Sequence, residues 1–92
     1  MGSIKSLKKE IHESMMILYA ECFFYKTFVI DADTESTDKL IDEIDNEYTL
    51  LLQRVNNGRK EDKRNTKKYY SQVRAYLKDV VNRTGDKLSK LA

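Results

Sequence analysis

Residues 15–30 read MMILYAECFFYKTFVI, and thirteen of these sixteen residues are apolar or aromatic. Only Glu21, Lys26 and Thr27 interrupt the run. A membrane span needs roughly 20 consecutive apolar residues, whereas this run is shorter and holds two charges. We therefore predict a buried helix with no role in a membrane, around which the rest of the chain packs.

Apolar residues at helical spacing continue this pattern toward the N-terminus. Ile4, Leu7, Ile11 and Met15 follow one another at intervals of three and four residues, which is typical of one face of a helix. We expect this first helix to cover residues 3–30. Its stripe continues through Leu18, Cys22 and Val29.

Two further helices are predicted after a polar turn at residues 31–36, DADTES. The second covers residues 37–57 and ends at Asn56-Asn57-Gly58, because Asn and Gly tolerate the left-handed conformation that ends many helices. The third covers residues 62–90. The apolar stripes of these two helices contain Leu40, Ile41, Ile44, Tyr48, Leu51, Leu52 and Val55, followed by Tyr70, Val73, Leu77, Val80, Thr84, Leu88 and Leu91.

The composition favours one small helical domain over residues 1–92. The chain has 35% charged residues, three Gly and no Pro, and its long segments of helix formers show no strand pattern. Short connections place consecutive helices antiparallel. The sequence therefore predicts an all-α, antiparallel, up-down-up three-helix bundle with a long apolar first helix.

Size and cysteine content limit the functions that we expect. A domain of 92 residues has little room for an internal cleft, so we predict no enzyme, no catalytic residues and no cofactor. The single cysteine, Cys22, excludes an intrachain disulfide and lies in the apolar run. A buried, reduced thiol there is typical of a cytoplasmic protein.

Two sequence patterns resemble metal sites in part. Asp31, Asp33, Glu35 and Asp42 occupy positions 1, 3, 5 and 12 of an EF-hand loop, but Ser36 stands where the loop needs Gly. His12 and Cys22 are ten residues apart and cannot share a metal on one helix. We predict no metal site and interpret His12 as a solvent-side residue.

Charge is segregated along the chain. Residues 1–30 carry four basic and three acidic residues, residues 31–58 carry two and eight, and residues 59–92 carry eleven and four. A helical hairpin centred near Gly58 would place Asp38 near Lys78, Asp42 near Arg74 and Glu47 near Tyr69. Most of the opposite charges would then neutralise one another within the bundle.

The basic residues at 54–68 are the exception, because few acids lie beside them. The first helix would bring Lys5, Lys8 and Lys9 to the same end. A solvated loop is one interpretation; the other is a phosphate-binding patch with Tyr69 and Tyr70 stacking on bases. The candidate phosphate-contacting residues are Arg59, Lys60, Lys63, Arg64, Lys67 and Lys68.

The opening Ile4-Lys5-Ser6-Leu7-Lys8-Lys9-Glu10-Ile11 and the order of apolar, acidic and basic helices resemble a group of proteins from Bacteroidetes-type bacteria. These are short, uncharacterised helical proteins. The resemblance implies a helical, cytoplasmic protein and carries no activity or functional residues to this chain.

The function that the sequence favours is a non-enzymatic interaction module that forms a homodimer. Apolar side chains point nearly all round the first helix between residues 15 and 30, while two neighbouring helices cover roughly half of its circumference. The residues left over for a dimer interface are Phe23, Phe24, Phe28 and Ile30. The alternative function is a nucleic-acid-binding module that uses residues 54–68.

Overall fold

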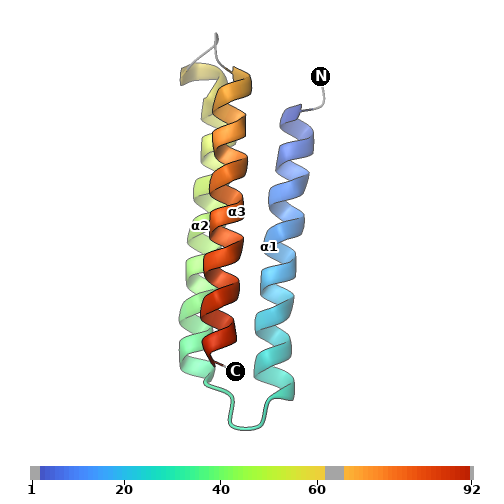
Figure 1. Ribbon diagram of the computed structural model, residues 1–92, viewed down its shortest axis with the longest axis vertical. Coiled ribbons are helices and arrows are strands. Elements are labelled where there is room, and N and C mark those ends of the chain that lie inside the picture. The colour runs from blue at the N-terminus through green and yellow to red at the C-terminus, as the bar shows by residue number, and fades with distance from the viewer. Residues whose placement is uncertain (1–2, 62–65, 92) are drawn as a thin grey trace.

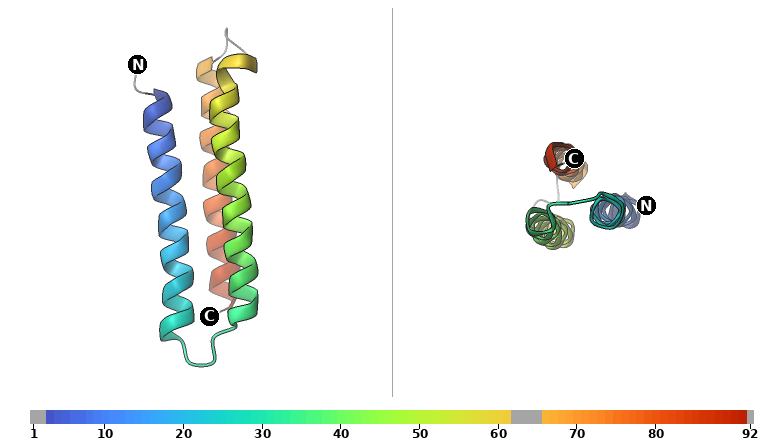
Figure 2. Two further views of the ribbon diagram at one scale, coloured as in Figure 1. Left: turned by 180° about the vertical axis from the view of Figure 1, so that it is seen from behind. Right: turned by 90° about the horizontal axis from the view of Figure 1, so that it is seen from below.

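The computed structural model describes residues 3–61 and 66–91, and these form three helices. The helices are α1 (Ser3–Phe28), α2 (Thr34–Glu61) and α3 (Thr66–Leu91). Consecutive helices are antiparallel along one axis, with α1 running down, α2 up and α3 down in Figure 1, and every pair of helices is in contact. An end-on view shows them at the corners of a triangle (Figure 2). The described chain contains no strand, so the predicted all-α three-helix bundle is confirmed.

The core lies between the inward stripes of the three helices. Leu7, Ile11, Met15, Leu18 and Cys22 are buried at the spacing that the sequence predicts. Burying a side chain of this kind contributes about 1.5 to 3 kcal/mol. The facing side chains are Leu40, Ile44, Leu51 and Val55 of α2 and Tyr70, Val73, Leu77 and Val80 of α3.

The first helix ends two residues earlier than predicted, at Phe28. Asp31 has a φ of 57°, in the left-handed region that Asp tolerates better than most residues, and this conformation reverses the chain. Val29, predicted in the core stripe, is therefore past the helix and 42% exposed. Tyr25, one turn before the end of α1, is buried in its place.

The second helix begins three residues earlier than predicted. Asp33, inside the predicted turn, is its N-cap: the Asp33 Oδ1 accepts a hydrogen bond of 3.0 Å from the Ser36 backbone N–H. The Thr37 hydroxyl donates to the Asp33 carbonyl at 2.7 Å, which explains why this threonine can be buried. The cap makes Thr34 the first helical residue.

The second helix also runs through Asn56-Asn57-Gly58 to Glu61, so the predicted stop at residue 57 is wrong. Gly58 is helical and buried, and it lies against the rings of Tyr69 and Tyr70. The third helix begins at Thr66 and passes through Gly85 to Leu91. Residues 62–65, where we expected its start, lie outside the described residues.

The longer α2 changes the register of the α2–α3 pair. Glu47 accepts a hydrogen bond from Tyr76 rather than lying near Tyr69, and Glu43 pairs with Lys87 at 2.8 Å. Arg74 pairs with Glu10 of α1 at 3.1 Å instead of Asp42. The expected neutralisation of charge within the bundle is present, but between different partners.

Candidate interaction surface on the first helix

The outward face of α1 carries exposed apolar side chains that the other two helices do not cover. Phe23, Phe24 and Phe28 are 57%, 61% and 70% exposed, and Ile30 just beyond the helix is 89% exposed. These four are the residues that the sequence predicted to remain uncovered by the other two helices and to form a dimer interface. The structure adds Met16, Ile17 and Val29 to the exposed apolar residues.

Helical spacing gathers most of these side chains into one patch. Positions 16, 20, 23, 24, 27 and 28 follow one another at intervals of one, three and four residues, opposite the buried stripe through Leu18 and Cys22. The rings of Phe24 and Phe28 stack with centroids 5.6 Å apart. We call residues 16, 17, 20, 23, 24, 27 and 28 the outer patch; none of them is charged.

A shallow hollow lies in the middle of the outer patch. Ala20 and Thr27 are its small residues, and Phe23 stands on one side of them with Phe24 and Phe28 on the other. The hollow has a volume of about 260 Å³ and is open to solvent. Its size and apolar lining suit the end of a large apolar side chain.

A second groove adjoins the outer patch between α1 and α3. Phe24 and Phe28 form part of its wall, and Leu88 and Gly85 of α3 form the opposite side. A Cβ at Gly85 would meet nothing within 4 Å, so this glycine leaves the groove open. The groove encloses about 370 Å³, which extends the exposed apolar surface toward α3.

Polar contacts on both flanks of α1 fix which face points outward. Toward α2, Tyr19 donates a hydrogen bond to Asp45, and Lys26 pairs with Asp38 at 2.6 Å. His12 Nδ1 and the Tyr48 hydroxyl, also on this flank, lie 2.7 Å apart, so His12 is exposed but has a partner. Arg74 holds the opposite flank through Glu10. Rotating α1 to bury the outer patch would break these contacts.

Tyr25 holds the end of α1 that carries the phenylalanines. Its hydroxyl donates a hydrogen bond to the Leu91 carbonyl at 3.0 Å and accepts one from the Asp33 backbone N–H at 2.9 Å. One buried side chain thus joins α1 to the start of α2 and the end of α3. Tyr25 lies outside the apolar stripe predicted for the first helix, yet it is buried.

The predicted phosphate-binding patch is only partly described. Lys67 and Lys68 are exposed at the start of α3, and the N-terminal turns of α1, with the exposed Lys5 and Lys8, lie at the same end (Figure 1). Lys63 and Arg64 lie outside the described residues. Arg59 and Lys60 belong to α2, but their side chains are outside the described part of the structure.

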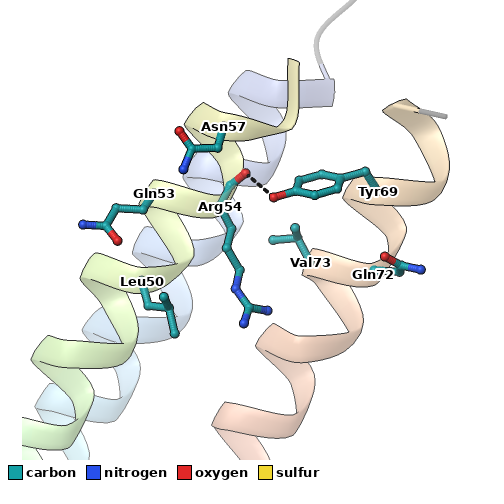
Figure 3. Close-up of a pocket in the computed structure, with 7 residues that line it drawn as sticks. All are labelled: Leu50, Gln53, Arg54, Asn57, Tyr69, Gln72 and Val73. Atoms are coloured by element: carbon teal, nitrogen blue, oxygen red, sulfur yellow. Dashed lines mark hydrogen bonds between the residues drawn. The ribbon is translucent and has the colours of Figure 1, made fainter. Parts of the chain in front are cut away.

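The tyrosines expected to stack on bases are used inside the bundle. The Tyr69 hydroxyl donates to the Arg54 carbonyl at 3.0 Å (Figure 3). The Tyr70 hydroxyl donates to the Val55 carbonyl at 3.2 Å. The Arg54 guanidinium lies 4.5 Å from the centre of the Tyr76 ring. Tyr70 is buried and therefore does not offer its ring to a base, whereas Tyr69 is half-buried. Stacking on Tyr69 stays a prediction.

A polar groove adjoins these residues on the α2–α3 face. It has a volume of about 320 Å³ and lies beside the Tyr69–Arg54 hydrogen bond (Figure 3). Its lining residues, which include Gln53, Asn57 and Gln72, are neutral apart from Arg54. The groove offers amide hydrogen bonds, and it has no carboxylate, histidine or cysteine in its lining.

Other candidate chemistry has a structural explanation. Within residues 3–61 and 66–91, no three His, Cys, Asp or Glu side chains are grouped closely enough to hold a metal. Asp33, at position 3 of the EF-hand-like pattern, caps α2.

Cys22 is buried as predicted, and burial raises the pKa of its thiol. No helix of the described chain is long and apolar enough to cross a membrane.

Comparisons with protein-family models, curated proteins and solved structures find no match for this chain. The resemblance to Bacteroidetes-type helical proteins stays a prediction. The strongest functional signal is thus a physical one, the exposed apolar outer patch of α1.

Proposed function

We propose that this chain is a small non-enzymatic interaction module that forms a homodimer through the outer patch of α1. The observation that carries the proposal is the exposure of three phenylalanines on one helix face. Single exposed apolar residues are common, but contiguous apolar patches larger than a few hundred Å² mark interaction sites. The proposal places this module in the cytoplasm, in keeping with its buried, lone cysteine.

The area of the patch supports a second copy as the partner. With about 200 Å² for a whole phenylalanine, Phe23, Phe24 and Phe28 together expose on the order of 400 Å². Met16, Ile17, Val29 and Ile30 add a few hundred Å² more. A stable interface buries about 800 Å² on each partner. The outer patch, together with Val29 and Ile30 just beyond the end of α1, therefore exposes about the apolar area that a two-fold dimer needs.

We propose no catalytic role. The hollow in the outer patch and the groove between α1 and α3 are open to solvent and lined mainly by apolar side chains. Glu21 is the one carboxylate in the lining of that groove. An acid–base or nucleophilic mechanism needs a second group within hydrogen-bond reach of the first. Nucleic-acid binding through Lys67 and Lys68 remains the alternative proposal, tested by whether binding weakens as salt rises.

Sedimentation equilibrium of the full chain tests the dimer. We expect twice the monomer mass of 10.8 kDa at roughly 10 to 100 μM. The double variant Phe24→Asp with Phe28→Asp should sediment as a monomer and keep its helical circular dichroism, because both side chains are exposed. A matched control, Ser71→Asp with Asn82→Asp, adds the same charge at exposed positions of α3 and should stay dimeric.

Three results would contradict the proposal. The first is a wild-type chain that sediments at the monomer mass, and the second is a dimer that survives both aspartate substitutions. The third is a monomer that co-sediments with phosphatidylcholine vesicles through Phe24 and Phe28, which would assign the outer patch to a lipid surface.

A further inference from the structure

We propose that the two copies dock with their α1 helices antiparallel, in a register that places Phe23 against Ala20 of the second copy and Met16 against Thr27. This inference rests on the proposed dimer and specifies its geometry. It follows from the order of large and small residues along the outer patch. The hollow in the outer patch and the charges at the two ends of the bundle support the same arrangement.

The outer patch contains a second seam, separate from the core stripe. Met16, Ala20, Phe23 and Thr27 follow one another at intervals of four, three and four residues, which is the spacing of a coiled-coil contact. All four are on the side of α1 opposite Leu18 and Cys22. One face of α1 therefore packs in its own bundle, while the other is spaced to meet another helix.

Large and small residues alternate along this seam, and only one orientation matches them. In a parallel pair, each residue faces its own copy, so Phe23 would meet Phe23 while Ala20 would meet Ala20. The Phe23 layer would then hold too much side-chain volume and the Ala20 layer too little. Overpacking and cavities both destabilise a packed contact. In the antiparallel register, Phe23 faces Ala20 and Met16 faces Thr27, so each layer combines one large and one small side chain.

The hollow in the patch is the structural counterpart of this pattern. It lies over Ala20 and Thr27 and is walled by phenylalanines on both sides. In the antiparallel register the Phe23 ring of one copy enters the hollow at Ala20 of the other, as a knob enters a hole. The same contact occurs twice by the two-fold symmetry, and Phe24 and Phe28 flank it.

Charge at the two ends favours the same orientation. The start of α1 carries Lys5, Lys8 and Lys9, whereas residues 31–35 at the other end carry three acids and no base. Antiparallel docking carries the start of each α1 past the end of the second copy's α1, toward these acids. Parallel docking would instead bring the lysines of both copies together, where like charges repel.

Disulfide trapping in the full chain tests the orientation separately from the dimer. In a Cys22→Ala background, Met16→Cys and Thr27→Cys chains are mixed, oxidised and identified by mass. A disulfide needs Cα atoms about 4.4 to 6.8 Å apart. In the antiparallel register position 16 faces position 27, whereas two copies of position 16 lie about 16 Å apart along the axis.

We expect the mixed 16–27 disulfide to exceed both self-linked species by at least tenfold. Ser71→Cys, an exposed position on α3, gives the background of random collisions. Self-linked 16–16 and 27–27 species from a dimeric protein would overturn the antiparallel arrangement and leave the dimer standing, as would a dimer with no disulfide above background. A monomer by sedimentation would remove the proposed function together with this inference.

Discussion

Gly58 of α2 lies against the ring of Tyr69 of α3. A Cβ built at Gly58 would come within 2.9 Å of Tyr69 Cδ1 and Cε1, and equally close to Tyr70 Cε1. Contacts under 3.0 Å between carbon atoms are repulsive, so only glycine allows these rings to approach α2. Both tyrosine hydroxyls donate hydrogen bonds to α2 carbonyls, those of Arg54 and Val55, one turn before Gly58. These bonds limit how far the rings can move away from α2.

We predict that Gly58→Ala destabilises the bundle. Alanine contributes about 0.5 to 1 kcal/mol through helix propensity, but overpacking costs about 1 to 3 kcal/mol. The expected net effect is a loss of about 1 kcal/mol in the free energy of unfolding, measured by urea denaturation. Equal or greater stability for Gly58→Ala would show that the tyrosines move aside without cost.

Gly85→Ala is the matched control and should have the opposite sign. Gly85 is also inside a helix, but a Cβ there meets nothing within 4 Å. Only the propensity gain of about 0.5 to 1 kcal/mol remains. The same urea titration should therefore show a higher midpoint for Gly85→Ala. A loss of stability would mean that the groove beside Gly85 needs to stay empty.

The role of Gly58 also explains the main error of the sequence analysis. Asn-Asn-Gly has the local character of a helix end, and the tyrosines that need the glycine lie eleven and twelve residues further along. Placing the stop at residue 57 shifted the α2–α3 register. The predicted partner of Glu47 was Tyr69, whereas the observed partner is Tyr76, which is seven residues or about two turns away.

Features that depend on local periodicity were predictable. The buried stripe of α1 follows from residue spacing, and the exposed phenylalanines follow from the limit on how much of α1 two neighbours can cover. Features that depend on contacts distant in sequence were not. Tyr25 is buried because its hydroxyl meets Asp33 and Leu91, and the groove beside Gly85 exists because the end of α3 packs beside the end of α1.

Tyr25→Phe should weaken the end of the bundle that carries the outer patch. The substitution removes the hydrogen bond to the Leu91 carbonyl and leaves the Asp33 N–H without its acceptor. Losses of about 1 to 3 kcal/mol are usual when a buried polar group loses its partner. Relative to the wild type, the variant should exchange its amide hydrogens faster at Asp33 and in the last turn of α3, with little change near Tyr70 at the other end. An equal increase in exchange rate at both ends would mean that Tyr25 supports the whole bundle.

Alkaline pH should destabilise the fold through Tyr19. Burial and then the hydrogen bond to Asp45 raise the pKa of Tyr19 above the ordinary value of about 10. Above that pH the unfolded chain loses the phenol proton while the folded chain keeps it, so the free energy of unfolding falls as pH rises toward the folded-state pKa. Tyr19→Phe should reduce this slope in urea titrations. An unchanged slope would exclude Tyr19 as its source.

Acid pH should act through Asp33. The hydrogen bond from the Ser36 backbone N–H lowers the pKa of the Asp33 carboxyl. A lowered folded-state pKa stabilises the fold above the unfolded value of about 3.9, and this stabilisation is lost as pH falls through the folded-state pKa. Asp33→Asn keeps a capping side chain that does not titrate. Its stability should therefore decline less than that of the wild type below about pH 4, as measured by thermal unfolding.

Thermal stability should depend on protein concentration if the outer patch joins two copies. Dimer formation stabilises the folded state by mass action, so the melting temperature rises as concentration increases. We expect a rise of several degrees between roughly 1 and 100 μM for the wild type, since a small domain shifts about 4 to 8 °C per kcal/mol. Phe24→Asp with Phe28→Asp should melt at one temperature across this range, because its three helices stay packed while the second copy is lost. Ser71→Asp with Asn82→Asp should keep the concentration dependence of the wild type. A wild-type melting temperature that does not change with concentration would place the stability of the bundle entirely within one chain.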